Sequence, residues 1–533
     1  MIKKHLSLLL FLVSLGLFAQ NPFDITLEPV TINGLNGLHS FAFGQDSNGK
    51  WLLVGGRIDG LHPMQGNAAF AASGNNTQLI VIDPATLQHW EAPLTSLPAS
   101  IQEQLSSTNM NFYQEGDYLY FIGGYGYSAT LNNHTTFPYL TAINVPQVID
   151  AVINNTGFTN FFRQINDPEF QVTGGILRKV NNVYHLLGGQ KFLGRYSMNS
   201  NNTSQEYTNQ VRRFTIDDDG TNIVVTHLAS FTDADVLHRR DLSAEAQILP
   251  NGQEGVTMFS GVFQISANLP FLNPVTIDSN GYSQDNNFQQ YYNHYQCPTI
   301  PLYSAGNNEM HTLFFGGMAQ YYDDNGTLVQ DDNVPFVKTI ARVTRDANGN
   351  MAEYKLPIEM PGYLGAGAEF IPVKSIPHYP NEVLKLDDIT GNNTLIGYIF
   401  GGINSTQPNI FFSNDSSLSS ASSQLFKVYL NSTLSVASHQ LNPQSTGILG
   451  MQVYPNPTNG VLKVDYKLKN TGNVILKITD INGRLIERKL LKNQVVGKNT
   501  YVHNLQKYPL GSVFFVTIQT PYETATQKII LKK

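Results

Sequence analysis

A short apolar run that ends in two small residues recurs six times before residue 403. The six copies occupy residues 51–56, 119–124, 184–189, 256–261, 312–317 and 397–402. Four consecutive apolar residues are typical of a strand that is buried on both faces, and a glycine pair permits a sharp turn where side chains would clash. A repeat of this kind, in a chain with few helix signals, predicts an array of similar sheets and therefore an all-β fold.

Asp-rich turns separate many of the predicted strands, as at residues 46–49, 217–220, 323–326 and 346–349. Asp, Asn and Gly favour the left-handed backbone of a hairpin tip, so we interpret these segments as hairpin tips. Structural calcium is the alternative, although none of the turns has the full spaced ligand set of a calcium loop. We predict no other cofactor.

The first copy of the repeat is followed by a second strand at 78–83 and by Trp90. A run that ends in Gly-Gly and leads into such a strand resembles the kelch repeat. That resemblance implies a β-propeller with four-stranded blades over residues 20–437. Six copies imply six blades, with seven as the alternative, and the fourth copy departs from the pattern with Ser260 in place of its first glycine.

The first 19 residues have the pattern of a secretory signal peptide. Lys3 and Lys4 precede an apolar run over 6–18, and Ala19 is a small residue at the cleavage point. The run is too short to cross a bilayer and no later segment is long enough, so we expect no transmembrane segment in the mature chain. The only cysteine is Cys297, which excludes a lipid-modified cysteine at the new N-terminus.

The C-terminal segment differs from the rest of the chain in charge. Residues 451–533 hold 13 Lys and Arg against 4 Asp and Glu, a net charge of +9, which leaves −16 for the preceding residues. This asymmetry predicts a separate C-terminal domain. The mildly acidic main body argues against a nucleic-acid partner, since phosphate binding needs a basic face.

The same segment carries a set of short motifs: Tyr454, Pro455, Asn456, Pro457, Asp480, Gly483 and Gly511. With its alternating strands and basic tail, it resembles the type A sorting domain of the type IX secretion system of Bacteroidetes-type bacteria. The resemblance implies recognition by the outer-membrane translocon, removal by a sortase, and release or display at the cell surface. The strand pattern alone predicts a small Ig-like antiparallel sandwich over 451–533, after a polar linker over 438–450.

The main body contains no familiar catalytic signature, neither a nucleophile elbow nor a His-Glu-x-x-His, phosphate-loop or dinucleotide motif. The candidate ligand-binding residues therefore come from their position beside the repeats. Arg57, Lys191, Arg195 and Tyr196 follow the anchors of the first and third copies, where we expect a mouth of the propeller. Solvated arginines are the alternative interpretation.

A dense polar cluster precedes the fourth copy and is formed by His238, Arg239, Arg240 and Asp241. It has the chemistry to bind an anionic or sugar ligand through bidentate contacts, or else to lock two blades together through an Arg–Asp pair. Tyr292, His294 and Glu369 are expected to add polar and aromatic groups to the same mouth, which would suit carbohydrate.

These patterns predict a secreted or surface-displayed binding module for a glycan or a surface protein. The main alternative is an enzyme on the same scaffold, of the mutarotase or epimerase type, in which an Arg and a Glu would orient and deprotonate a sugar. A structural role at the cell surface or in gliding is the third possibility. The three roles differ in what they need from the mouth: catalysis needs a convergent acid–base pair, binding needs only aromatic and polar complementarity, and a structural role needs neither.

Overall fold

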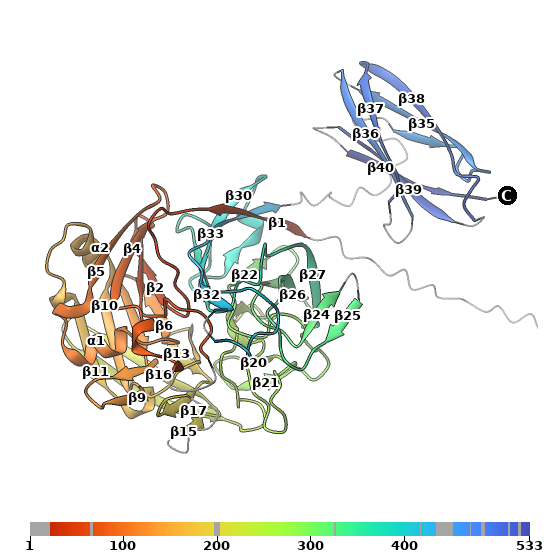
Figure 1. Cartoon of the computed structure of the whole chain (residues 1–533). Helices are drawn as coiled ribbons and strands as arrows, with labels where there is room; N and C mark the ends of the chain where they lie inside the picture. The colour runs from red at the N-terminus through yellow and green to blue at the C-terminus, as the bar shows by residue number, and fades with distance from the viewer. Residues whose placement is uncertain are drawn as a thin grey trace, which may run out of the picture. The chain divides into compact units, whose positions relative to one another are not determined.

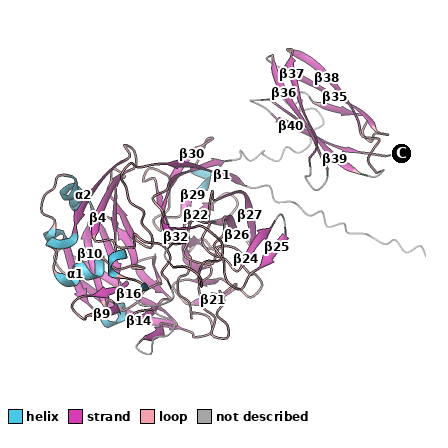
Figure 2. Cartoon of the chain, in the orientation of Figure 1, coloured by secondary structure: helices cyan, strands magenta, loops and turns pink. Residues whose placement is uncertain are grey.

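The structure is a computed structural model that describes residues 22–63, 68–196, 203–324, 327–415, 417–432, 451–468, 471–480, 485–509, 512–520 and 524–532. The chain forms two compact units, Met1–Thr433 and Leu434–Lys533. The predicted signal peptide over 1–19 and the predicted linker over 438–450 lie outside the described residues. Strands dominate both units (Figure 2).

Within the described part of the first unit, six antiparallel sheets follow one another in chain order (Figure 1). Sheet 1 is formed by β2 (Ala42–Gln45), β3 (Trp51–Val54), β4 (Gln78–Asp83) and β5 (Gln88–Pro93). Sheet 2 is formed by β6 (Asn111–Glu115), β7 (Tyr118–Ile122), β10 (Tyr139–Asn144) and β11 (Phe162–Asn166). Sheet 3 is formed by β12 (Ile176–Val180), β13 (Val183–Leu187), β16 (Gln210–Asp218) and β17 (Ile223–Thr232).

The next three sheets repeat this order. Sheet 4 is formed by β18 (Ala244–Ile248), β19 (Glu254–Met258), β20 (Val275–Ile277) and β21 (Tyr282–Gln284). Sheet 5 is formed by β22 (Thr299–Ser304), β23 (Glu309–Phe315), β26 (Thr339–Arg345) and β27 (Met351–Glu359), with the short β29 (Leu384–Lys385) added in parallel beside β22. Sheet 6 is formed by β28 (Ala368–Pro372), β30 (Thr394–Gly401), β33 (Leu425–Ser432) and β1 (Phe23–Val30).

Smaller elements decorate the six sheets. The remaining strands are β8 (Tyr125–Ser128), β9 (Asn133–Thr136), β14 (Gln190–Leu193), β15 (Ser204–Tyr207), β24 (Tyr321–Asp324), β25 (Thr327–Gln330), β31 (Ile403–Ser405) and β32 (Ser419–Ala421). The two described α-helices are α1 (Ala99–Leu105) and α2 (Val145–Ile153), and short 3₁₀ turns lie at Ala72–Gly74, Leu94–Ser96, Thr159–Phe161, Pro168–Phe170 and Leu386–Asp388. The N-terminus of α2 is capped by Asn144, whose side chain accepts a hydrogen bond from the Gln147 N–H.

A closed circuit of backbone hydrogen bonds joins the six sheets at the entry to their first strands. One residue from each sheet takes part, and each N–H donates to the carbonyl of the next member at 2.6 to 3.3 Å. The circuit runs Ser40, Gly367, Gln296, Asp241, Gly174, Asn109 and back to Ser40. The six sheets are therefore arranged around one axis, with β2, β6, β12, β18, β22 and β28 innermost.

The repeated anchors also connect neighbouring sheets. In five copies the N–H of the second glycine donates to a carbonyl at the entry of the next sheet, as from Gly124 to Val172 at 3.1 Å and from Gly189 to Arg239 at 2.7 Å. In the fourth copy the hydroxyl of Ser260 instead donates to the carbonyl of His294 at 2.6 Å. The serine that replaces the first glycine therefore keeps a hydrogen bond between neighbouring sheets, with its hydroxyl as the donor.

The C-terminal unit consists of two antiparallel sheets around a shared apolar core. One sheet contains β34 (Gln452–Tyr454), β35 (Val461–Leu468) and β38 (Gly497–Asn504). The other contains β36 (Gly472–Asp480), β37 (Leu485–Gln494), β39 (Val513–Gln519) and β40 (Thr524–Ile530). Alternating residues of both sheets, such as Leu462 and Ile478, face the core and are fully buried. Across the described residues of both units, no helix is long and apolar enough to cross a membrane.

Candidate functional site

A pocket of about 140 Å³ lies on the anchor side of the hydrogen-bonded circuit. We call it the anchor-side pocket. Its floor is formed by the residues that enter the first strand of each sheet: His39, Ser40, Thr108, Asn109, Thr173, Arg240, Asp241, Tyr295, Gln296 and Ala366. Because all six sheets contribute, the pocket lies on their common axis, which is where ring-shaped folds collect their functional groups.

Arg240 and Asp241 form the charged wall of this pocket. Their side chains pair directly and are only 11% and 14% exposed. The Arg240 Nε also donates to the Tyr207 hydroxyl at 2.9 Å, and the guanidinium lies 5.3 Å from the ring centre of Phe263. Although burial disfavours its charge, the neighbouring Asp241 raises the pKa of Arg240, so the guanidinium is held charged and rigid beside the pocket.

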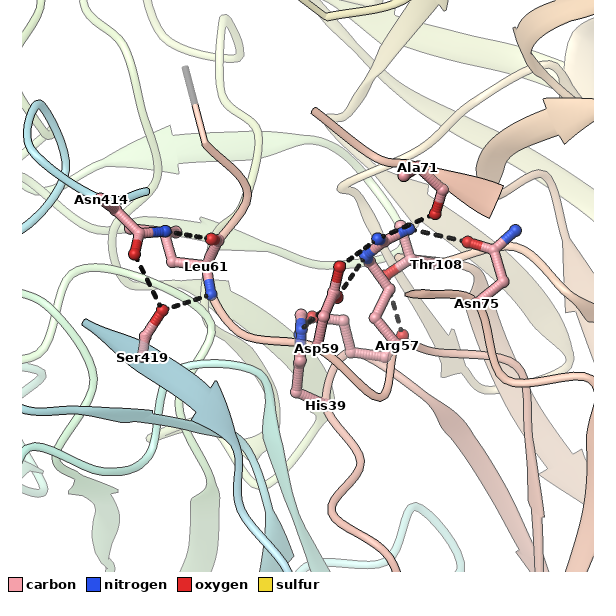
Figure 3. A network of polar contacts seen from close by, with 10 residues as sticks. His39, Arg57, Asp59, Leu61, Ala71, Asn75, Thr108, Asn414 and Ser419 are labelled. Atoms are coloured by element: carbon pink, nitrogen blue, oxygen red, sulfur yellow. Dashed lines mark hydrogen bonds and ion pairs between the residues drawn. The ribbon is translucent and has the colours of Figure 1, made fainter. Parts of the chain in front are cut away.

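Arg57 forms the second polar wall and is 1% exposed. Its Nε donates to the Asp59 carboxylate at 2.8 Å, and its Nη1 donates to Asn75 Oδ1 at 2.7 Å (Figure 3). A further bond runs from Nη2 to the Ala71 carbonyl at 3.1 Å. Arg57 is therefore held in a fixed orientation, and its positive charge is neutralised by the carboxylate of Asp59.

Aromatic rings form the outer rim of the pocket. His62 stacks on Phe70 with ring centres 4.5 Å apart, and Tyr196 meets His62 edge-on at 5.0 Å. Tyr125 and Phe411 complete the rim. Flat apolar faces beside fixed polar groups suit a ligand that has both a hydrophobic face and hydroxyl groups.

The two histidines of the pocket are neutral near pH 7. Burial lowers the pKa of His39 and of His62 to about 4, and the nearby charge of Arg57 acts in the same direction. The pocket thus contains two balanced Arg–Asp pairs and two uncharged imidazoles. This arrangement offers hydrogen-bonding groups without presenting a large net charge.

Four of the sequence-predicted residues converge on this pocket: Arg57, Tyr196, Arg240 and Asp241. Arg239 does not line it. Its guanidinium is fully buried and donates to the carbonyls of Val236, Ser260 and Asn273, so it holds the fourth anchor in place. The Arg–Asp pair of the predicted cluster forms between Arg240 and Asp241, and Arg239 bonds carbonyl groups of its own repeat instead.

The other residues that the sequence predicted for the propeller mouth do not line the anchor-side pocket. His238 stacks on Tyr207 at 3.8 Å and bonds Asn209, outside the lining of the pocket. His294 is fully buried, with Nε2 bonded to the Gln290 carbonyl and Nδ1 accepting from the Gln320 N–H. Lys191, Arg195 and Tyr292 are likewise absent from the lining.

Glu369 lines a second cavity, on the other side of the circuit. This inner-strand cavity has a volume of about 200 Å³ and is bounded by at least one polar side chain from each innermost strand, including Gln45, Gln114, Arg178, Glu245, Thr299 and Glu369. Glu369 is therefore separated from Arg57 and Arg240 of the anchor-side pocket, and the arginine that shares its cavity is Arg178.

Sequence reasoning missed most of the anchor-side pocket, including His39, His62 and Phe70, and all of the charged groups around Glu369. The signal for the floor of the pocket was the position of its residues at the entry to the first strand of each sheet. The residue that enters each first strand adopts a positive φ in five of the six described sheets, as in Ser40 and Asn109. These positions are not marked by any repeated residue type, so one sequence does not reveal them.

Two of the Asp-rich turns, at 46–49 and 346–349, use a carboxylate internally. Asp46 Oδ1 accepts from the N–H groups of Asn48 and Lys50 at 2.9 and 2.8 Å, and Asp346 makes the same bonds with Asn348 and Asn350. This is the arrangement of a hairpin tip. Among the described residues, no group of three or more His, Cys, Asp or Glu side chains is placed to hold a metal ion.

The motif residues of the C-terminal unit have structural partners. The Tyr454 hydroxyl donates to Asp465 at 2.8 Å, and Asn456 bridges to the Lys528 carbonyl and the Ile530 N–H of the last strand. Pro455 and Pro457 flank Asn456, so the motif fastens the first strand to the last. Asp480 ends β36, while Gly483 and Gly511 lie outside the described residues.

Residues 452–532 match the family described as the secretion system C-terminal sorting domain. The predicted sorting domain is therefore confirmed, and it implies secretion to the cell surface or the extracellular space. No curated protein is similar to the chain in sequence.

Two solved structures illustrate the similarity of the whole chain. The structure of YjhT is 9% identical with a TM-score of 0.40, over 74% of this chain and 97% of that one. A glycoside hydrolase family 43 arabinoxylan arabinofuranohydrolase from Bacillus subtilis, in complex with cellotetraose, is 10% identical with a TM-score of 0.30, over 91% and 95%. Nothing about the ligand of this chain follows from similarity at this level.

Proposed function

We propose that the first unit is a six-bladed, kelch-like propeller that is exported through the type IX secretion system and binds a glycan in the anchor-side pocket. Sheets 1 to 6 are its blades in this proposal, and β1 completes the sixth blade beside β33. The C-terminal unit, with an Ig-like sandwich, is the part that the translocon and sortase recognise.

The observation that carries the binding role is the composition of the anchor-side pocket. Arg57 and Arg240 are each fixed by a carboxylate and by further bonds, so their remaining N–H groups have defined directions. The ring of Tyr196 lies at the rim within 5.0 Å of His62. A sugar ring offers hydroxyl groups to the first kind of group and an apolar face to the second.

The test is a glycan array with the full secreted protein, followed by calorimetry on each hit with a Tyr196→Ala variant. We expect at least a tenfold loss of affinity, because the variant removes the stacking face and leaves the Arg–Asp pairs in place. Tyr127→Ala is the matched control. Tyr127 is also half-buried, it contacts His134 at 5.4 Å, and it lies outside the pocket lining.

Two results would overturn the binding role. One is the absence of any glycan hit with a correctly folded protein. The other is an equal affinity of the Tyr196→Ala variant and the unaltered protein, since that result would put the glycan on another surface.

Export is tested separately in the native type of host by removing residues 451–533. We expect the truncated protein to accumulate inside the cell and the full chain to reach the medium or the surface. Secretion of the truncated chain at the normal level would contradict the role of the C-terminal unit.

A further inference from the structure

The inner-strand cavity contains more carboxylates than its positive groups balance. Glu245 accepts from Arg178 Nη2 at 2.8 Å and from the Thr299 hydroxyl. The side chains of Glu369 and Glu382 line the same cavity, Glu382 at its exposed rim, and neither carboxylate accepts a hydrogen bond from a described residue. One guanidinium, already paired with Glu245, therefore faces two further carboxyl groups.

The other titratable groups around the cavity do not make up the difference. Lys179 pairs with Glu115, and Tyr113 is a neutral phenol whose pKa is raised by burial. Lys374 and His378 are exposed at the rim beside the exposed Glu382, and the His378 ring bonds the Ile376 carbonyl. Lys374 acts on Glu382, whereas Arg178 is the positive group that acts on Glu369. The interior of the cavity is consequently short of positive charge whenever its carboxyls are ionised.

Two buried side-chain amides in the cavity also lack hydrogen-bond donors. Asn111 is 1% exposed and Asn381 is 6% exposed, and both line the cavity. The amide oxygen of each has no hydrogen-bond partner, whereas their NH₂ groups donate to backbone carbonyls. A buried acceptor without a donor is destabilising, so a ligand that brings several donors is favoured. One unpaired donor, Arg178 Nε, is also present.

We propose that the inner-strand cavity binds a small ligand through a cationic nitrogen group, a guanidinium or an ammonium, placed between Glu369, Glu382 and the unpaired amide oxygens. Such a group supplies both the missing charge and the missing donors. Phe43, Phe112 and Phe370 line the cavity as well, and aromatic faces attract cations. The volume of about 200 Å³ admits a group the size of an arginine side chain. This site is separate from the glycan pocket and does not depend on it.

Proton exchange follows from this arrangement. Burial, which outweighs the attraction of Arg178, raises the pKa of Glu369 to about 8, and desolvation also raises the pKa of Glu382. A bound cation stabilises the ionised carboxylates, so binding releases protons below pH 8. The affinity therefore rises with pH until Glu369 is ionised in the free protein.

The experiment is isothermal titration calorimetry of the full chain with butylguanidinium and with its neutral isostere butylurea, at pH 6 and pH 9. We expect butylguanidinium to bind at least tenfold more tightly at pH 9 than at pH 6, and butylurea to bind weakly at both. Titrations in two buffers of different ionisation enthalpy measure the released protons directly.

The Glu369→Gln variant should lose at least tenfold in affinity at pH 9 and most of the pH dependence. Glu359→Gln is the control, since Glu359 pairs with Lys355 on an outer strand. Glu382→Gln serves as a second variant at the rim. Equal binding of butylurea, a flat pH profile, an unchanged Glu369→Gln variant or no binding would each overturn the proposal. Tyr196→Ala should leave this binding intact, which separates the outcome from that of the glycan test.

Discussion

At the scale of single residues, the anchors work because glycine lets two backbones touch. Gly123 has a φ of +70°, and a Cβ built on it would lie 1.7 Å from the Val172 carbonyl oxygen of the next sheet. We expect Gly123→Ala to lower the free energy of unfolding by about 3 kcal/mol or more, because the clash adds to the strain of the left-handed backbone. Urea unfolding followed by fluorescence measures this, since both tryptophans, Trp51 and Trp90, lie in sheet 1.

Gly116→Ala provides the matched control for that change. Gly116 also has a positive φ, +57°, but no atom lies within 4 Å of its added Cβ. It should cost only the backbone strain, about 1 to 2 kcal/mol. Equal losses for the two variants would mean that conformation alone, and not contact between sheets, explains the glycines of the repeat.

Residue chemistry also explains how much of the site was predictable. Arg57, Tyr196, Arg240 and Asp241 were identified because they follow or precede a recognisable anchor. Arg239 has the same sequence context as Arg240, yet its guanidinium turns inward to three carbonyls. Neighbouring residues on a strand-entry loop point in different directions, and a sequence without coordinates does not distinguish them.

At the scale of elements, the strand β1 closes the ring. It pairs with β33 along its whole length, from Phe23 with Ser432 to Val30 with Leu425. Phe23 is fully buried and meets His311 of sheet 5 edge-on at 5.5 Å. We expect Phe23→Ala to destabilise the first unit by about 3 to 5 kcal/mol, as is typical of a buried phenylalanine, with urea unfolding as the measurement.

Phe412→Ala is the matched control for Phe23→Ala. It makes the same change of residue type outside β1, so it tests whether the loss of stability comes from the closing strand. Phe412 is 60% exposed, so its removal should change the free energy of unfolding by less than about 0.5 kcal/mol. A Phe23→Ala variant as stable as this control would show that β1 contributes little to the ring.

The six apolar runs were predicted as buried strands, and all six second strands of the sheets end at an anchor or within two residues of it. The pairing of β1 with β33 was not predicted. The two strands are about 400 residues apart, and nothing in β1 itself specifies a partner. Local patterns define strands, whereas the register between distant strands is decided by the closure of the whole ring.

At the scale of the whole molecule, buried histidines and buried glutamates have opposite effects on how stability changes with pH. Burial lowers the pKa of His185 and of His294 to about 4, as it does for the two pocket histidines. These groups bind protons more readily in the unfolded chain, so they reduce stability as the pH falls from about 6.5 through 4. Burial raises the pKa of Glu353 and of Glu369 to about 8, and these groups reduce stability as the pH rises from about 4.5 through 8.

The two effects together place the highest stability of the first unit at mildly acidic pH, and one variant separates them. Glu369→Gln removes a carboxyl that is neutral at pH 5 and ionised at pH 9. We therefore expect it to raise the free energy of unfolding by about 1 kcal/mol at pH 5 and by about 4 kcal/mol or more at pH 9, measured by urea unfolding with tryptophan fluorescence. The exposed Glu359→Gln should give no such gain. An equal effect of Glu369→Gln at both pH values would show that the carboxyl is already ionised at pH 5. The proton release proposed for cation binding in the inner-strand cavity would then be wrong.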